Sequence, residues 1–117
     1  MFNENLIKED SLIELELSNI CNANCIFCPY IKIKETNKNF GVMNDKIFSK
    51  VLKIIEKEKY QKISFTPTTG EILINKDWDK FIRKTFDLKN IKRVLFYSNA
   101  ILLNEINQEK LIRLIEN

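Results

Sequence analysis

The sequence has no histidine and only three cysteines, Cys21, Cys25 and Cys28, which all lie in one short stretch, CNANCIFCPY. Three cysteines at this spacing are poorly suited to a disulfide framework, which favours a reducing compartment. No apolar run approaches the roughly 20 residues that a membrane span requires. Residues 1–11 are rich in acids and unlike a signal peptide. We therefore expect a cytoplasmic protein that has no contact with a membrane.

Glycine and proline are also scarce, with two of each, while hydrophobic residues make up 44% and charged residues 30% of the chain. This composition is typical of a globular protein rather than a disordered or fibrous one. A length of 117 residues suits a single domain. The net charge is only +3, and the 19 basic residues are scattered among 16 acidic ones without forming a basic stripe. Nucleic acid is therefore not an expected partner.

Alternating apolar and charged residues in SLIELEL predict a first strand, and two short runs of β-forming residues, KISFTP and KRVLFYS, predict two more. Apolar residues at helical spacing predict three helices. Asn44 is a candidate N-cap of the first helix, and Leu111, Leu114 and Ile115 are predicted to face inward from the third. The predicted strands cover residues 11–17, 62–67 and 92–98, and the predicted helices cover residues 45–57, 75–77 to 86, and 108–116.

The order β-α-β-α-β-α predicts an α/β fold in which parallel strands form a sheet and helices pack on it. Residues 12–117 then form three βα units of one domain, and residues 1–11 lead into it. Functional residues in such folds lie at the carboxyl ends of the strands. Three loops leave those ends here, namely the cysteine loop, TPTTGE and YSNA.

The three cysteines follow the spacing C-x-x-x-C-x-x-C, so one curled segment can direct all three sulfurs inward. Thiolates are soft ligands for zinc, copper(I) or iron–sulfur clusters. A structural zinc site requires four protein ligands, and this chain has neither a fourth cysteine nor a histidine. In a cubane cluster three thiolates hold three of the four irons, which leaves one iron for a substrate or cofactor. The pattern therefore favours an iron–sulfur cluster over zinc, and over thiols that simply pack in a core.

The stretch CNANCIFC, in which Phe27 precedes the last cysteine, resembles the cluster-binding loop of the radical S-adenosylmethionine (SAM) enzymes, whose pattern is C-x-x-x-C-x-aromatic-C. In that family the loop also follows the first strand. The resemblance implies that Cys21, Cys25 and Cys28 bind a [4Fe-4S] cluster whose fourth iron is chelated by SAM. It also implies that Phe27 lies near the adenine of SAM.

Two further motifs support the resemblance. Thr69-Gly70-Glu71 is similar to the family's Gly-Gly-Glu after the second strand, whose backbone and carboxylate meet the SAM amino group, although Thr69 replaces the first glycine. Ser98-Asn99-Ala100 is similar to the family's Thr-Asn-Gly after the third strand, with Ala100 in place of glycine. The resemblance implies that Ser98 and Asn99 help to orient SAM or the substrate. Gly41-Val42-Met43 resembles the family's entry to the first helix.

The resemblance implies the first half of a partial (βα)6 TIM-like barrel, and hence a fragment of a longer, oxygen-sensitive enzyme. Such an enzyme reductively cleaves SAM to a 5′-deoxyadenosyl radical that abstracts hydrogen from a substrate. The implied partners are a reductant such as a flavodoxin or ferredoxin and a substrate that is a peptide or small molecule. No catalytic side chain is assigned apart from the cluster ligands. Two alternatives stay open, a non-catalytic iron–sulfur module for electron transfer and a zinc-binding interaction domain.

Overall fold

The computed structural model describes residues 11–23, 25, 28, 32, 35, 39–65 and 70–116. Two residues predicted to lie in the site, Phe27 and Thr69, are outside these ranges. The described elements are strands β1 (Leu12–Glu14), β2 (Lys62–Ser64) and β3 (Arg93–Leu95), α-helices α3 (Asp45–Glu58), α4 (Trp78–Phe86) and α5 (Glu105–Glu116), and the short 3-10 helix η1 (Ile72–Ile74).

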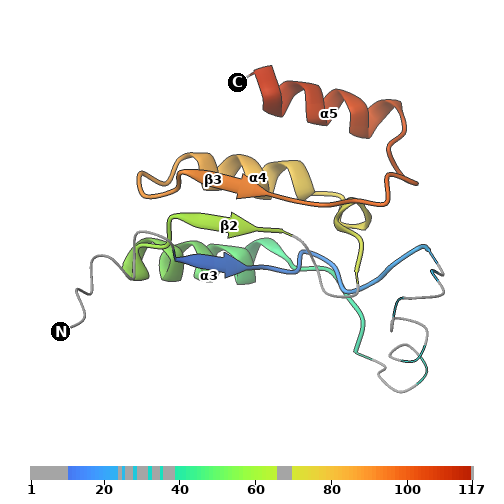
Figure 1. The fold of residues 1–117 in the computed structure, drawn as a ribbon, viewed down its shortest axis with the longest axis horizontal. Coiled ribbons are helices and arrows are strands. Elements are labelled where there is room, and N and C mark those ends of the chain that lie inside the picture. Colours follow the sequence, from blue (N-terminus) through green and yellow to red (C-terminus); the bar gives the residue numbers. More distant parts are fainter. Residues whose placement is uncertain are drawn as a thin grey trace.

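The three strands form one parallel sheet in the order β1-β2-β3 (Figure 1). The strands are shorter than predicted, but the hydrogen-bond ladder continues past them. The backbone N–H of Leu15 donates to the carbonyl of Ser64 (2.9 Å), and that of Phe65 donates to Leu95 (2.7 Å). The predicted α/β fold with parallel strands is therefore confirmed, and its three strand ends point toward the same edge of the sheet.

The helices cover one face of the sheet. Ile13, Ile63 and Val94 lie opposite one another in register and pack into the hydrophobic core. Successive side chains of a strand point to opposite faces, and in the next row Glu14 and Leu95 are exposed. The second face of the sheet is therefore free of the helices that the described residues form.

Aromatic rings hold α3 and α4 against the sheet. The Phe48 ring of α3 stacks on Phe81 of α4 with centroids 4.5 Å apart, and it lies 6.4 Å from the ring of Phe65, which follows β2. All three side chains are fully buried. Such pairs add about 0.5–1.5 kcal/mol beyond the burial of their area. This cluster fixes the helices close to the carboxyl ends of the strands, where the loops begin.

Two helices begin at asparagine caps. The Asn44 side chain accepts a hydrogen bond from the N–H of Ile47 (2.9 Å), as predicted for the start of α3. Asn104 does the same for the N–H of Asn107 (3.0 Å), so α5 begins at Glu105, earlier than the sequence pattern predicted. The pair Asn104-Glu105, an N-cap followed by an acid in the first turn, is a sequence signal for this start.

Polar contacts attach α5 to α4. The indole N–H of the fully buried Trp78 donates to the side-chain oxygen of Asn107 (3.0 Å). The ammonium group of Lys110 lies 3.5 Å from the Asp79 carboxylate, and both side chains are largely shielded from solvent. Together these contacts hold the first two turns of α5 beside the start of α4.

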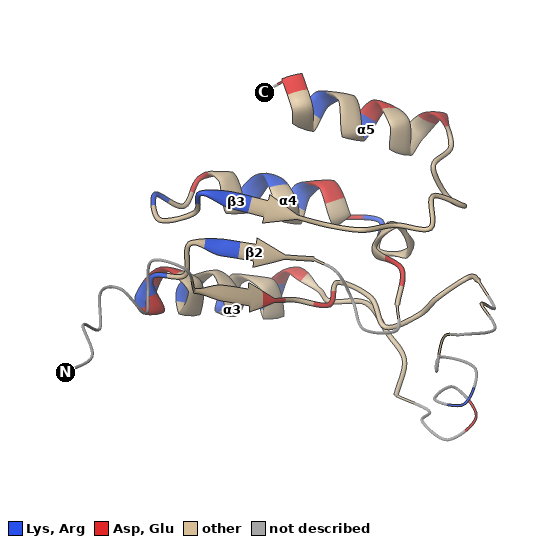
Figure 2. Ribbon diagram, viewed as in Figure 1, with Lys and Arg blue, Asp and Glu red and all other residues tan. Residues whose placement is uncertain are grey.

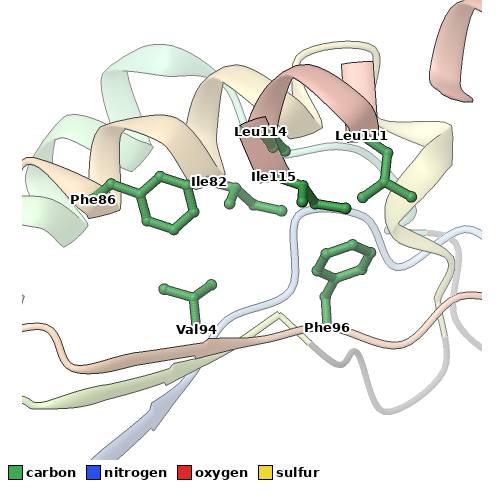
Figure 3. Close-up of a pocket in the computed structure, with 7 residues that line it drawn as sticks. All are labelled: Ile82, Phe86, Val94, Phe96, Leu111, Leu114 and Ile115. Carbon is green, nitrogen blue, oxygen red and sulfur yellow. The ribbon is translucent and has the colours of Figure 1, made fainter. Parts of the chain in front are cut away.

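The far end of α5 leaves an apolar groove of roughly 220 Å³ against α4 and β3 (Figure 3). Its lining residues are Ile82, Phe86, Val94, Phe96, Leu111, Leu114 and Ile115. Leu114 is 7% exposed, but Ile115 is 76% exposed. Ile115 thus faces the groove with Leu111 and Leu114, as predicted, but it stays exposed because the last turn of α5 lies at the open rim of the groove.

Charged residues of both signs are mixed on α3, α4 and α5 (Figure 2). Neither sign gathers on one of these helices alone, as expected from the scattered charges of the sequence. Within the described part of the chain, every helix is too short or too polar to cross a bilayer.

Candidate functional site

The cysteine loop leaves β1 through a stem of backbone hydrogen bonds. The N–H of Met43 donates to the carbonyl of Leu17 (2.9 Å), and the N–H of Asn19 donates to that of Gly41 (3.3 Å). The Asn19 side chain adds two contacts, because its oxygen accepts from the N–H of Gly41 (2.7 Å) and its amide donates to the carbonyl of Asn39 (2.9 Å). The segment before α3 therefore closes the base of the cysteine loop.

Gly70 lies against this stem. A Cβ atom at position 70 would overlap the carbonyl oxygen of Ser18 and would lie 2.8 Å from the Cα of Asn19. The next N–H, that of Glu71, donates to the carbonyl of Ile20 (2.8 Å), directly before the first cysteine. Only glycine allows this close approach between the loops that follow β1 and β2.

Glu71 joins the second loop to the third. Its carboxylate accepts a hydrogen bond of 2.6 Å from the Ser98 hydroxyl and one of 2.9 Å from the backbone N–H of Asn99. The N–H of Leu73 donates to the same carboxylate (3.2 Å) and begins η1. Glu71 is only 3% exposed, so this carboxylate is buried but has three donors around it. Such charge-assisted bonds are among the stronger hydrogen bonds of proteins.

Asn99 returns from the third loop to the first. Its side-chain amide donates to the side-chain oxygen of Asn22 (2.9 Å) and lies 3.8 Å from the sulfur of Cys21. Its side-chain oxygen accepts from the N–H of Ile101 (3.0 Å). The three loops predicted to form the site are thus connected by hydrogen bonds from Ile20 through Glu71 to Asn99.

Ala100 has a left-handed backbone conformation, with φ of 62°. Its N–H donates to the Ser98 hydroxyl (2.9 Å), which fixes this turn. Alanine is disfavoured in this region because its Cβ lies too close to the backbone. The conformation explains physically why a glycine suits this position, which alanine occupies here.

A cavity of roughly 200 Å³ opens where the three loops meet. Its lining residues are Cys21, Ala23, Cys25, Gly70, Glu71, Tyr97, Ser98 and Asn99. Six residues predicted from the sequence to lie in the site are therefore found together. Cys28 does not line this cavity; its backbone N–H donates to the carbonyl of Cys25 (3.1 Å). All three cysteines are free thiols, and in the described ranges no three Cys, Asp or Glu side chains gather closely enough to hold a metal ion.

Sequence reasoning missed Tyr97 and Ala23 in this cavity. Tyr97 is 68% exposed and immediately precedes Ser98. Its signal is the alternation that runs from β3 into the residues after it, because Val94 and Phe96 pack against the core while Leu95 and Tyr97 are exposed. An exposed aromatic side chain at the end of a strand could have been identified in this way.

Sequence reasoning also missed the role of Asn75. This side chain is only 2% exposed, and its amide donates to the carbonyls of Leu17 (2.9 Å) and Met43 (3.1 Å). Its oxygen accepts from the N–H of Asp77 (3.0 Å). Asn75 therefore fastens the stem of the cysteine loop to the segment between η1 and α4. A turn-forming asparagine before a helix gives no sign of these distant partners.

Comparison with known proteins identifies the family. The family model of the Radical SAM superfamily matches residues 15–117, which include all three loops of the site. The chain belongs to the radical SAM superfamily. The prediction made from the cysteine loop and the two supporting motifs is confirmed.

Relatives of known name are also radical SAM proteins. The chain is 33% identical over 99 residues to the GTP 3′,8-cyclases of Clostridium botulinum strains Hall and Langeland, an alignment that covers 83% of this chain. It covers only 30% of each relative's length. The chain therefore corresponds to one portion of these relatives.

Solved radical SAM structures share the fold. The crystal structure of BtrN in complex with AdoMet and 2-DOIA superposes with a TM-score of 0.72 at 27% identity, covering 89% of this chain and 42% of that one. A selenomethionine BtrN structure in an open conformation gives a TM-score of 0.70 at 27% identity, with 45% of that chain covered. The predicted cofactors, a [4Fe-4S] cluster and SAM, are those of the superfamily, and AdoMet is present in the first BtrN structure.

Proposed function

We propose that this chain forms the cofactor-binding part of a radical SAM enzyme, in which Cys21, Cys25 and Cys28 hold the [4Fe-4S] cluster. One observation carries the proposal. Cys21 and Cys25 line the same cavity as Glu71, at the point where the loops after three parallel strands meet. Parallel-strand folds bind their ligands at this edge of the sheet.

The donors at the site suit these cofactors. Three free thiols without any histidine favour an iron–sulfur cluster, and three thiolates leave one iron open for SAM. The buried Glu71 carboxylate at the cavity provides a negative charge for the SAM ammonium group. Its three donors keep it in one orientation, which prepares it to receive a cation.

Other residues support the site from the loops. Gly70 places Glu71 against the cysteine loop, and Ser98 and Asn99 orient its carboxylate from the third loop. The predictions that Phe27 lies near the adenine of SAM and that Thr69 contributes to its site fall outside the described residues. Both remain part of the proposal on the strength of the motif alone.

When held by Cys21, Cys25 and Cys28, the cluster would supply the electron for cleavage of SAM to methionine and a 5′-deoxyadenosyl radical that abstracts hydrogen. The side chains of this cavity bind and orient SAM. A flavodoxin or ferredoxin is the proposed reductant. We favour a small-molecule substrate over a peptide, because the named relatives are GTP cyclases and BtrN was solved with 2-DOIA. Residues 12–117 would supply the first three βα units of a (βα)6 barrel.

The test uses the full chain, reconstituted with iron and sulfide without oxygen. The first expected result is a [4Fe-4S] absorption spectrum. After reduction with dithionite, the chain should show an electron paramagnetic resonance (EPR) signal that changes when SAM is added, and it should form 5′-deoxyadenosine. Cys21→Ala should abolish all three. Ser49→Ala, at an exposed position of α3, is the matched control and should behave like the parent chain.

Three results would contradict the proposal. A cluster whose EPR signal does not change when SAM is added would indicate the electron-transfer module instead. Stoichiometric zinc without iron or sulfide would indicate the zinc-binding domain. SAM cleavage that survives Cys21→Ala would exclude the assigned ligand.

A further inference from the structure

The side chain of Asn99, in the loop after β3, reaches a cysteine sulfur of the first loop. The amide nitrogen lies 3.8 Å from Cys21 Sγ and 2.9 Å from the side-chain oxygen of Asn22. A side-chain amide carries two N–H groups, so it can serve both acceptors at once. The first of these contacts joins the third loop directly to a proposed cluster ligand.

The orientation of this amide is set by its other partners. Its oxygen accepts from the N–H of Ile101 (3.0 Å), so the nitrogen must face Cys21 and Asn22. The backbone N–H of Asn99 donates to the Glu71 carboxylate (2.9 Å), and Glu71 is almost fully buried. The donor near Cys21 is therefore positioned by Ile101 and Glu71 from outside the cysteine loop, in addition to its contact with Asn22.

We propose that the Asn99 amide donates a hydrogen bond to the Cys21 thiolate and thereby raises the reduction potential of the cluster, an inference that rests on the proposed function. Hydrogen bonds to the sulfurs are one of the factors that set the potential of iron–sulfur clusters. The reduced cluster carries one more electron, so its sulfurs are more negative and gain more from an N–H donor. Asn99 is thus a positioning residue that makes the cluster easier to reduce.

The test is a redox titration of the reconstituted full chain, in which the EPR signal of the reduced cluster is measured at each potential. Asn99→Ala removes the donor without adding charge and should shift the midpoint potential to a more negative value. Asn99→Asp keeps an oxygen for the N–H of Ile101 but replaces the donor with an anion, so its shift should be larger in the same direction. Asn90→Ala, in the connection between α4 and β3, is the matched control and should leave the potential unchanged.

An unchanged or raised potential in Asn99→Ala, with the cluster fully assembled, would overturn the inference while leaving the proposed function intact. Loss of the cluster from both Asn99 variants would overturn it as well, because Asn99 would then be required for assembly rather than for the potential. If the parent chain assembles no cluster, the proposed function itself fails, and the inference fails with it.

Discussion

Gly70 lies against Ser18 so closely that no side chain fits between them, because a Cβ atom there would overlap the Ser18 carbonyl oxygen. The neighbouring atoms are backbone, and they belong to the stem of the cysteine loop. We predict that Gly70→Ala lowers the free energy of unfolding by about 1–3 kcal/mol, the usual cost of overpacking. Urea unfolding of the full chain measures this change.

Gly41 offers the matched control, since a Cβ atom added there meets nothing within 4 Å. Gly41→Ala should change the stability by no more than about 0.5 kcal/mol. Equal losses in the two variants would show that the close approach of Gly70 to Ser18 is not what makes glycine necessary.

Replacing Ala100 by glycine should stabilise the protein. Ala100 has φ of 62°, which glycine adopts without the cost that Cβ imposes. The gain exceeds the extra chain entropy that glycine brings to the unfolded state, and we expect a net increase of about 0.5–1 kcal/mol in the free energy of unfolding. Ala23→Gly is the control, because Ala23 is not among the described residues with positive φ and should lose stability. A loss in both variants would contradict the prediction.

Asn75→Ala should destabilise the chain because it removes the side-chain donor of the Met43 and Leu17 carbonyls, of which Leu17 keeps the backbone N–H of Met43. An unsatisfied buried polar group costs about 1–3 kcal/mol. The measurement is thermal or urea unfolding, with Asn90→Ala as a substitution of the same type elsewhere. Amide hydrogen exchange should also become faster in the stem, notably at the N–H of Met43. Unchanged exchange at Met43 would mean that Asn75 does not fasten the stem.

Two consecutive residues of α5 that line the apolar groove should respond differently to truncation. Leu114 is 7% exposed and Ile115 is 76% exposed, although both line the groove. Leu114→Ala should cost about 2 kcal/mol, at the low end for a buried leucine because the groove is open on one side. Ile115→Ala should cost at most about 0.5 kcal/mol. If Ile115→Ala costs as much as Leu114→Ala, the last turn of α5 packs more closely than the structure shows.

Local patterns were enough to predict the order of the elements and the loop that carries the cysteines. Alternation in residues 11–17 and helical spacing after Asn44 depend on neighbours in the sequence, and both predicted elements are found. The strands are shorter than predicted because only three residues of each strand are paired in the sheet. Residues 62–64 of β2 pair with residues 12–14 on one side and with residues 93–95 on the other. The short helix η1 was not predicted, since its start depends on the buried carboxylate of Glu71.

The contacts that build the site could not be predicted in the same way. Glu71 reaches Ser98, Asn75 reaches Leu17, and Gly70 reaches Ser18 only after the sheet brings distant loops together. The motif marked Gly70 and Glu71 as candidate contacts of SAM, but it did not show that each also supports another loop. The exposed fraction of Ile115 likewise depends on the distance between α5 and β3. The spacing of apolar residues along a helix does not determine this distance.

The closed stem of the cysteine loop has a consequence for protein engineering. Asn19 joins Gly41 and Asn39 at the base of the loop, so both ends of the segment between them are fixed independently of its length. For a chain segment whose ends are held together, doubling the length costs only about 0.6 kcal/mol more. Residues could therefore be inserted between Cys28 and Asn39, or exchanged for those of another family member, while the sheet and the spacing of the cysteines stay as they are.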